Sequence, residues 1–219
     1  MTAQASIPGE REHPSLALVN SRHNSRTGVV DHLTTRETLR EWLAWRSLVP
    51  GGAVTGDEDA SPQHGAASGG EGDHPPRERS AAPRDPELDA AVALRDAIRE
   101  LLAAAIEHRA PAESAVATVN EAAAAAPASD QLRWDDAGRP RRTRSARAAT
   151  DVERALAALA EDAIALVCDH RDRLIACEAP GCVRLLLKDH PRRHWCSTRC
   201  GDRVRAARYY RRSRETAGS

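Results

Sequence analysis

The sequence predicts a mainly α-helical protein with a small zinc module at its C-terminal end. Apolar residues recur at helical spacing in several segments, capping signals stand at the beginnings of these segments, and four cysteines cluster within residues 177–200. A chain of 219 residues is long enough for one ordinary domain and a small module. We expect a helical N-terminal domain over 1–170 that includes a short β-hairpin, a zinc finger over 171–214 and a disordered tail over 215–219.

The first elements are a short apolar run and two capped helices. Residues 16–21 (LALVNS) fit a helix or a strand, and periodicity does not decide between them. Thr34 with Glu37 is a capping-box signal for a helix that should stop at Pro50. Asp85 and Pro86 form a good N-cap and first-turn pair, followed by apolar residues at helical spacing as far as 106.

Residues 51–84 differ in composition from the rest of the chain. They are rich in Gly, Ser, Pro and acidic residues and have scarcely a large apolar side chain. Such a segment buries too little surface to offset its ordering entropy. We predict a disordered acidic loop.

A further helix, a hairpin and a last long helix complete the N-terminal domain. Pro111 opens a helix that Pro127 closes. Residues 131–134 read as a strand that runs into a turn at 135–138, and 139–147 is the expected partner strand. Thr150 with Glu153 is a second capping box, at the start of an amphipathic helix that leads to the cysteines.

The cysteines have the spacing of a metal site. Cys177 and Cys182 are separated by four residues, Cys196 and Cys200 by three, and Pro180 with Gly181 supplies a turn inside the first pair. Zinc binds four soft donors at tetrahedral corners, and short turns place paired sulfurs on one side of it. Two disulfides or idle thiols are the alternative interpretation, and the missing export signal argues against disulfides. His190 or His194 replacing a cysteine, and Cys168 acting as more than a small core side chain, are lesser possibilities.

The segments around the cysteines resemble a treble clef. Residues 183–187 read as a strand, His194 and Trp195 as the start of the return strand, and Ser197 as the N-cap of a helix that runs through Arg212. Four thiolates leave no open position for water or substrate, so we expect a structural zinc. The chain also lacks a Gly-rich phosphate loop and a nucleophile motif, and we expect no enzymatic activity.

Charge is distributed unevenly along a chain whose formal net charge is zero. Residues 171–219 hold 13 Arg or Lys against 5 Asp or Glu, a net charge of +8, so residues 1–170 carry −8. The basic end is suited to a polyanion. With no apolar run long enough to cross a membrane and no signal peptide, we expect a cytoplasmic protein without membrane contact.

The last helix carries the residues most suited to contacting nucleic acid. They are Arg199, Arg203, Arg205, Arg208, Arg211 and Arg212. Val204, Ala207 and Tyr210 are spaced to pack inward. In the alternative interpretation, Arg184, Arg199 and Arg203 neutralise the zinc site, whose four thiolates leave a net charge of −2. The module would then bind a protein partner, a second copy of the chain or the chain's own acidic half.

Several motifs resemble the CGNR zinc finger family, in which the module follows a helical domain called ABATE. They are the residues around Cys196 (Trp-Cys-Ser), the run 200–203 (Cys-Gly-Asp-Arg), the LALVNS run, the helices near 36–48 and after Pro86, and 132–136 (LRWDD). Asp202 stands where the family name has Asn. The resemblance implies transcriptional regulation, in some members linked to stress. We therefore expect a DNA-binding regulator with a structural zinc, and a zinc-stapled protein-interaction module as the alternative. A ligand role for the polar residues 20–23 stays open beside turn formation.

Overall fold

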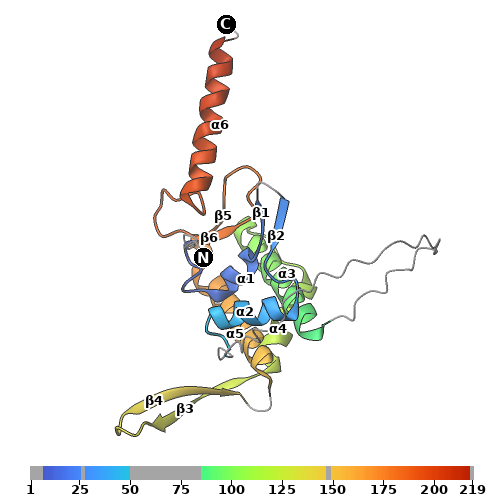
Figure 1. The fold of residues 1–219 in the computed structure, drawn as a ribbon, viewed down its shortest axis with the longest axis vertical. Coiled ribbons are helices and arrows are strands. Elements are labelled where there is room, and N and C mark those ends of the chain that lie inside the picture. Colours follow the sequence, from blue (N-terminus) through green and yellow to red (C-terminus); the bar gives the residue numbers. More distant parts are fainter. Residues whose placement is uncertain (1–6, 26–27, 50–84, 147–148, 218–219) are drawn as a thin grey trace, which may run out of the picture.

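The computed structural model describes residues 7–25, 28–49, 85–146 and 149–217. The predicted disordered loop over 51–84 lies outside these ranges. Within them, the predicted mainly α fold is confirmed (Figure 1). The helices are α1 (Pro14–Asn20), α2 (Arg36–Trp45), α3 (Pro86–Glu107), α4 (Glu113–Ala125), α5 (Asp151–His170) and α6 (Thr198–Ala217), and a short 3-10 turn at Arg171–Arg173 follows α5.

The strands of the described residues form three separate antiparallel hairpins. They are β1 (Arg22–Ser25) with β2 (Gly28–Asp31), β3 (Ala128–Trp134) with β4 (Pro140–Ala146), and β5 (Leu174–Ala176) with β6 (Leu185–Leu187). The β3–β4 hairpin is the predicted one. The β1–β2 and β5–β6 pairings were not predicted from the sequence.

Side-chain caps mark where α2, α3 and α5 begin. The capping box of α2 is formed by Thr35 and Thr38, not by Thr34 and Glu37 as predicted, and α2 ends at Trp45, before Pro50. The side chain of Asp85 accepts hydrogen bonds from two backbone N–H groups at the start of α3. Thr150 and Glu153 cap α5 reciprocally, as predicted.

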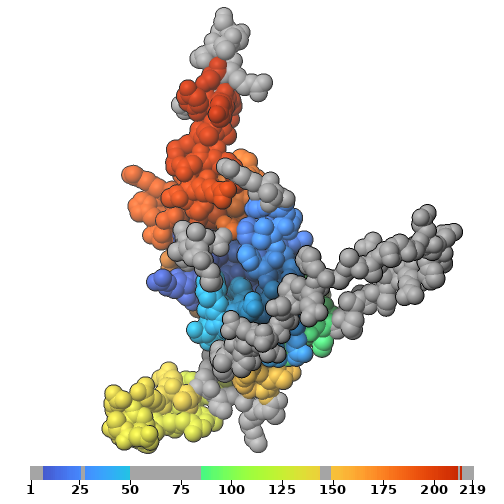
Figure 2. Space-filling view, viewed as in Figure 1, coloured from blue at the N-terminus to red at the C-terminus, as the bar shows by residue number. Residues whose placement is uncertain are grey.

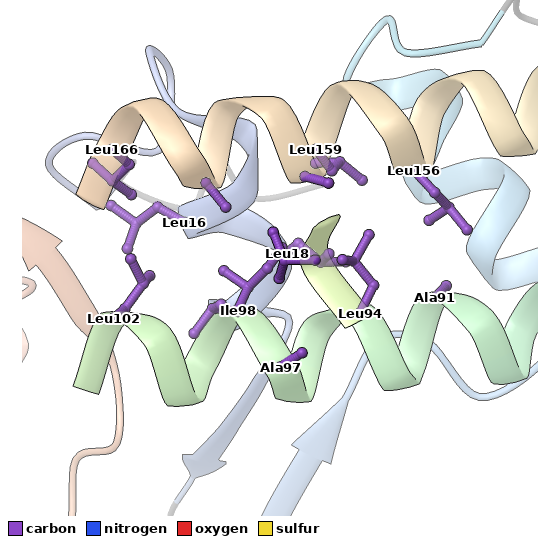
Figure 3. Close-up of a cluster of buried hydrophobic side chains, with 14 of the residues drawn as sticks. Leu16, Leu18, Ala91, Leu94, Ala97, Ile98, Leu102, Leu156, Leu159 and Leu166 are labelled. Carbon is purple, nitrogen blue, oxygen red and sulfur yellow. The ribbon is translucent and has the colours of Figure 1, made fainter. Parts of the chain in front are cut away.

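The main core lies between α1, α3, α4 and α5. Leu16 and Leu18 of α1 lie between α3 and α5, with Leu16 near Leu102 and Leu166 and Leu18 near Ile98 (Figure 3). The run 16–21, which fitted a helix or a strand, is therefore mostly helix, and its apolar residues are completely buried. Most contacts in this core involve Leu, Val or Ala, because the chain has no Phe.

The β5–β6 hairpin joins this core to the zinc module. Leu185 and Leu187 of β6 belong to the main core, whereas Leu186, whose side chain points to the other face, belongs to a second cluster with Ile7, Val204 and the cysteines. The two units therefore share one strand.

Asn20, at the end of α1, links the two units by hydrogen bonds. Its side-chain amide donates to the backbone carbonyl of Leu185 (2.9 Å) and to Glu10 Oε1 (2.9 Å), and its Oδ1 accepts from the backbone N–H of Leu185 (3.0 Å). Asn20 is buried. It thus satisfies both backbone groups of Leu185, as a neighbouring strand would.

Two elements project from the body in opposite directions. Figure 1 shows α6 at one end and the β3–β4 hairpin at the other, and Figure 2 shows both standing clear of the globular part. No helix among the described residues is long and apolar enough to cross a membrane.

Candidate metal centre and basic helix

The structure brings the four predicted ligand sulfurs together. The Sγ atoms of Cys177, Cys182, Cys196 and Cys200 all lie within 4.8 Å of one another. Cys196 Sγ lies 3.8 Å from that of Cys182 and 3.6 Å from that of Cys200. Four sulfurs at tetrahedral corners, each about 2.3 Å from a zinc ion, are about 3.8 Å apart. The cluster therefore fits zinc without rearrangement.

The first cysteine pair lies in the turn between β5 and β6. Gly181 has a φ of 71°, and the N–H of Cys182 donates to the carbonyl of Ala179 (3.0 Å), which closes the turn that the Pro-Gly pair predicted. The predicted return strand at His194 and Trp195 is wrong, because β6 pairs with β5, the strand before the first cysteine.

The second cysteine pair lies at the start of α6. Ser197 caps this helix, since its hydroxyl accepts from the N–H of Cys200 (3.3 Å). The N–H of Cys196 donates to the sulfur of Cys177 (3.4 Å) and so connects the two pairs. The helix continues to Ala217, beyond the predicted end at Arg212 and into the segment predicted as a disordered tail.

Three of the four thiols, those of Cys177, Cys182 and Cys196, shift one another's pKa. Hydrogen bonds from Cys182 and Cys196 lower the pKa of Cys177 to about 2. The Cys177 sulfur in turn raises the pKa of Cys182 to about 11 and also raises that of Cys196. The Cys177 thiolate therefore forms readily, whereas Cys182 and Cys196 resist ionisation, and a divalent cation at the centre would favour their thiolates. The close approach of the four sulfurs remains the observation that marks this cluster as a metal site.

Arg203 contacts the metal cluster itself. Its guanidinium donates to the sulfur of Cys200 (3.6 Å), as the charge-neutralising interpretation predicts. The guanidinium groups of Arg184 and Arg199 make no hydrogen bond to a ligand sulfur in the described residues. Of the predicted neutralising arginines, Arg203 alone therefore donates to a sulfur in this part of the chain.

Trp195 supports the first turns of α6. A Cβ added at Gly201 would lie 3.0 Å from the Trp195 ring, so only glycine allows this close approach without displacing the ring. The Arg205 guanidinium lies 5.9 Å from the ring centre and donates to Asp202 Oδ1 (2.6 Å). Asp202 is thereby paired within the helix.

The outer part of α6 has no packing partner in the described residues. Val204 is its last buried side chain. The predicted inward positions Ala207 and Tyr210 are wrong, because both are exposed. The helix leaves the body after Val204, so helical spacing there no longer marks a buried face. Of the arginines predicted to contact nucleic acid, Arg199, Arg203, Arg205, Arg208 and Arg211 are exposed, while the side chain of Arg212 lies outside the described part.

The other candidate residues lie away from the metal cluster. His194 contacts Glu178 Oε1 (2.8 Å), and His190 Nδ1 accepts from the N–H of Arg192 (3.1 Å). Cys168 is exposed on α5 instead of packing in the core. The polar residues 20–23 differ in burial: Asn20, Ser21 and His23 are buried, and Arg22 is exposed.

Comparison with protein families supports this arrangement. The ABATE family model, described as a putative stress-induced transcription regulator, matches residues 12–170, most of the chain. The chain belongs to the ABATE family. Residues 173–213 match the CGNR zinc finger, which identifies zinc as the cofactor of the four-cysteine site. No curated protein matches this chain. The ABATE match covers α1 to α5, and the zinc finger match covers β5, β6 and most of α6.

Proposed function

We propose that this ABATE protein binds DNA through α6 and regulates transcription. One observation carries the proposal: beyond Val204, every described side chain of α6 is exposed, and arginines dominate this free surface. Residues 198–217 contain seven arginines and two carboxylates, a net charge of +5. Like charges along a helix repel one another, so a polyanion is the partner that would stabilise it.

The dimensions of α6 suit a DNA groove. Twenty helical residues extend about 30 Å, and the major groove admits an α-helix. Arg199, Arg208 and Arg211 make no ion pair in the described residues, so their guanidinium groups are available for phosphates or guanine edges. Arg203 and Arg205 are engaged by Cys200 and Asp202, and their assignment to nucleic acid stays a prediction.

The zinc site supports this role as a scaffold. Four thiolates fill a tetrahedron and leave no position for a substrate, so we propose no catalytic activity for it. The ion fixes the start of α6 to the β5–β6 hairpin, which packs on the ABATE domain, and thereby sets the direction in which the helix projects. A cytoplasmic location is part of the same proposal.

Titration with mixed-sequence duplex DNA at several salt concentrations tests the proposal. With about four phosphate contacts, the logarithm of the association constant should fall against the logarithm of salt concentration with a slope of about −4. An acidic protein such as bovine albumin serves as the control for unspecific charge attraction. Absence of DNA binding at low salt would refute the proposal and favour a protein-interaction module.

A further inference from the structure

A groove of about 260 Å³ lies where the β1–β2 hairpin and α3 meet the first zinc turn. Its walls are Arg22, His23, Asn24, Val29, Arg99 and Val183, with no carboxylate among them. Asn24 donates to the carbonyl of Gly181 (3.1 Å), which fixes the hairpin to the zinc turn at this point. The groove thus has one wall in each of the two units.

The two arginines of the groove have little compensating charge. Arg99 donates to three backbone carbonyls, those of Val183 (2.9 Å), Val19 (2.5 Å) and Arg22 (3.1 Å), and to no carboxylate. Among the described residues, the one carboxylate that Arg22 pairs with is Asp31, at 4.0 Å. Asp31 is already held by two hydrogen bonds from the buried Arg95, at 2.6 and 2.9 Å.

Positive charge is concentrated around Arg99. Burial lowers the pKa of Arg99, and the positive charges of Arg95 and Arg22 lower it further, while the carboxylate of Asp96 opposes this effect. Nδ1 of His23, a wall residue of the groove, is buried and has no hydrogen-bond partner among the described residues. An anion in the groove would place a negative charge beside Arg22 and Arg99, where the groove walls have no carboxylate.

The flanks of the groove are apolar and open to solvent. Val29 is 63% exposed and Val183 is 41% exposed. A free phosphate would leave these side chains in water. A ligand with a short apolar body would cover them and gain free energy by doing so.

We propose that this groove binds a small organic carboxylate. The carboxylate group lies at Arg22 and Arg99, and the apolar body lies between Val29 and Val183. The groove takes a compact ligand, because its volume is below that of sites for drug-sized molecules. Val183 follows the zinc ligand Cys182, so the ligand would tie the ABATE domain to the metal site. This site is separate from the DNA contact proposed for α6.

Isothermal titration of the zinc-loaded full chain with three carboxylates, benzoate, hexanoate and isovalerate, tests the charge requirement. At least one should bind saturably, and its uncharged amide should bind at least about tenfold more weakly, because a charge-assisted hydrogen bond is lost. Acetate, which has the charge without the apolar body, should also bind more weakly. Absence of saturable binding by all three, or equal binding of an amide, would overturn the proposal.

Variants locate the binding site. Arg22→Gln should weaken carboxylate binding about tenfold or more, because it removes one of the two guanidinium groups that hold the carboxylate. Arg22 is exposed, so the substitution should leave the fold intact. Val29→Ser should weaken it several-fold through lost apolar contact. Arg133→Gln, on the distant β3–β4 hairpin, is the matched control and should change nothing. Equal affinities of Arg22→Gln and Arg133→Gln would place the ligand elsewhere.

Two further measurements, DNA binding by Arg22→Gln and titration with inorganic phosphate, distinguish a carboxylate site from a phosphate contact. Arg22→Gln should leave the affinity for duplex DNA and its salt dependence unchanged. A reduced DNA salt slope in Arg22→Gln, or binding of inorganic phosphate in preference to the carboxylates, would assign the groove to a phosphate contact and overturn the carboxylate proposal. Failure of α6 to bind DNA would leave the carboxylate titration unaffected, so the two proposals fail separately.

Discussion

The double substitution Cys196→Ser, Cys200→Ser should reduce the zinc content from about one ion per chain to none and unfold the C-terminal module. The buried cluster around the cysteines is small, with Ile7, Leu186 and Val204 as its larger apolar members. Metal binding therefore supplies most of the folding free energy there, as in other structural zinc sites, where it is worth about 10–16 kcal/mol.

The loss should stay local. Leu185 and Leu187 pack in the main core together with α1, α3 and α5, so the ABATE domain should still unfold cooperatively on heating. Metal analysis and circular dichroism before and after chelation check both parts. Cys168→Ser, which removes the exposed cysteine of α5, is the matched control and should retain one zinc. Zinc retained by the double variant would contradict the site.

Asn20→Ala should lower the free energy of unfolding by about 2–4 kcal/mol. The substitution leaves the buried N–H and C=O groups of Leu185 without the partner that Asn20 provides, and each unpaired group costs about 1–3 kcal/mol. Asn20→Asp should cost more, because a carboxylate cannot donate to Leu185 and would face Glu10, which accepts a hydrogen bond from Asn20 at 2.9 Å.

Asn24→Ala provides the matched control for the junction. Asn24 also bonds to the backbone of the zinc turn, but its hydrogen bond to Gly181 is exposed to water. Its loss should cost less than about 1 kcal/mol. Denaturant unfolding of the zinc-loaded variants measures both effects. Equal costs for the two substitutions would show that Asn20 does not link the units.

Local signals in the sequence were sufficient for much of the fold. The cap at Asp85 and the capping box at Thr150 predicted where α3 and α5 begin, because a cap depends on neighbouring residues alone. The metal site could also be predicted from the sequence, because one short turn places the two sulfurs of each cysteine pair on the same side of the metal.

Features that depend on contacts between distant residues could not be predicted from the sequence. The strand β5 has three residues, too few for a periodic pattern, so the sequence predicted a strand over 183–187 but not its pairing with β5. The Asn20–Leu185 bond spans 165 positions, so nothing in the local sequence indicates it. Helical spacing placed Tyr210 inward because spacing assumes a body to pack against, and α6 projects away from it.

The most direct measurement of the central claim compares two triple variants in the DNA titration. Arg199→Ala, Arg208→Ala, Arg211→Ala removes the three arginines of α6 that make no ion pair among the described residues, whereas Arg133→Ala, Arg141→Ala, Arg142→Ala removes the same charge from the exposed β3–β4 hairpin. We predict that the α6 variant keeps its zinc and loses about three units of salt slope, leaving about −1, while the hairpin variant keeps the slope of the unmodified protein. Equal slopes for the two variants would contradict DNA contact through α6.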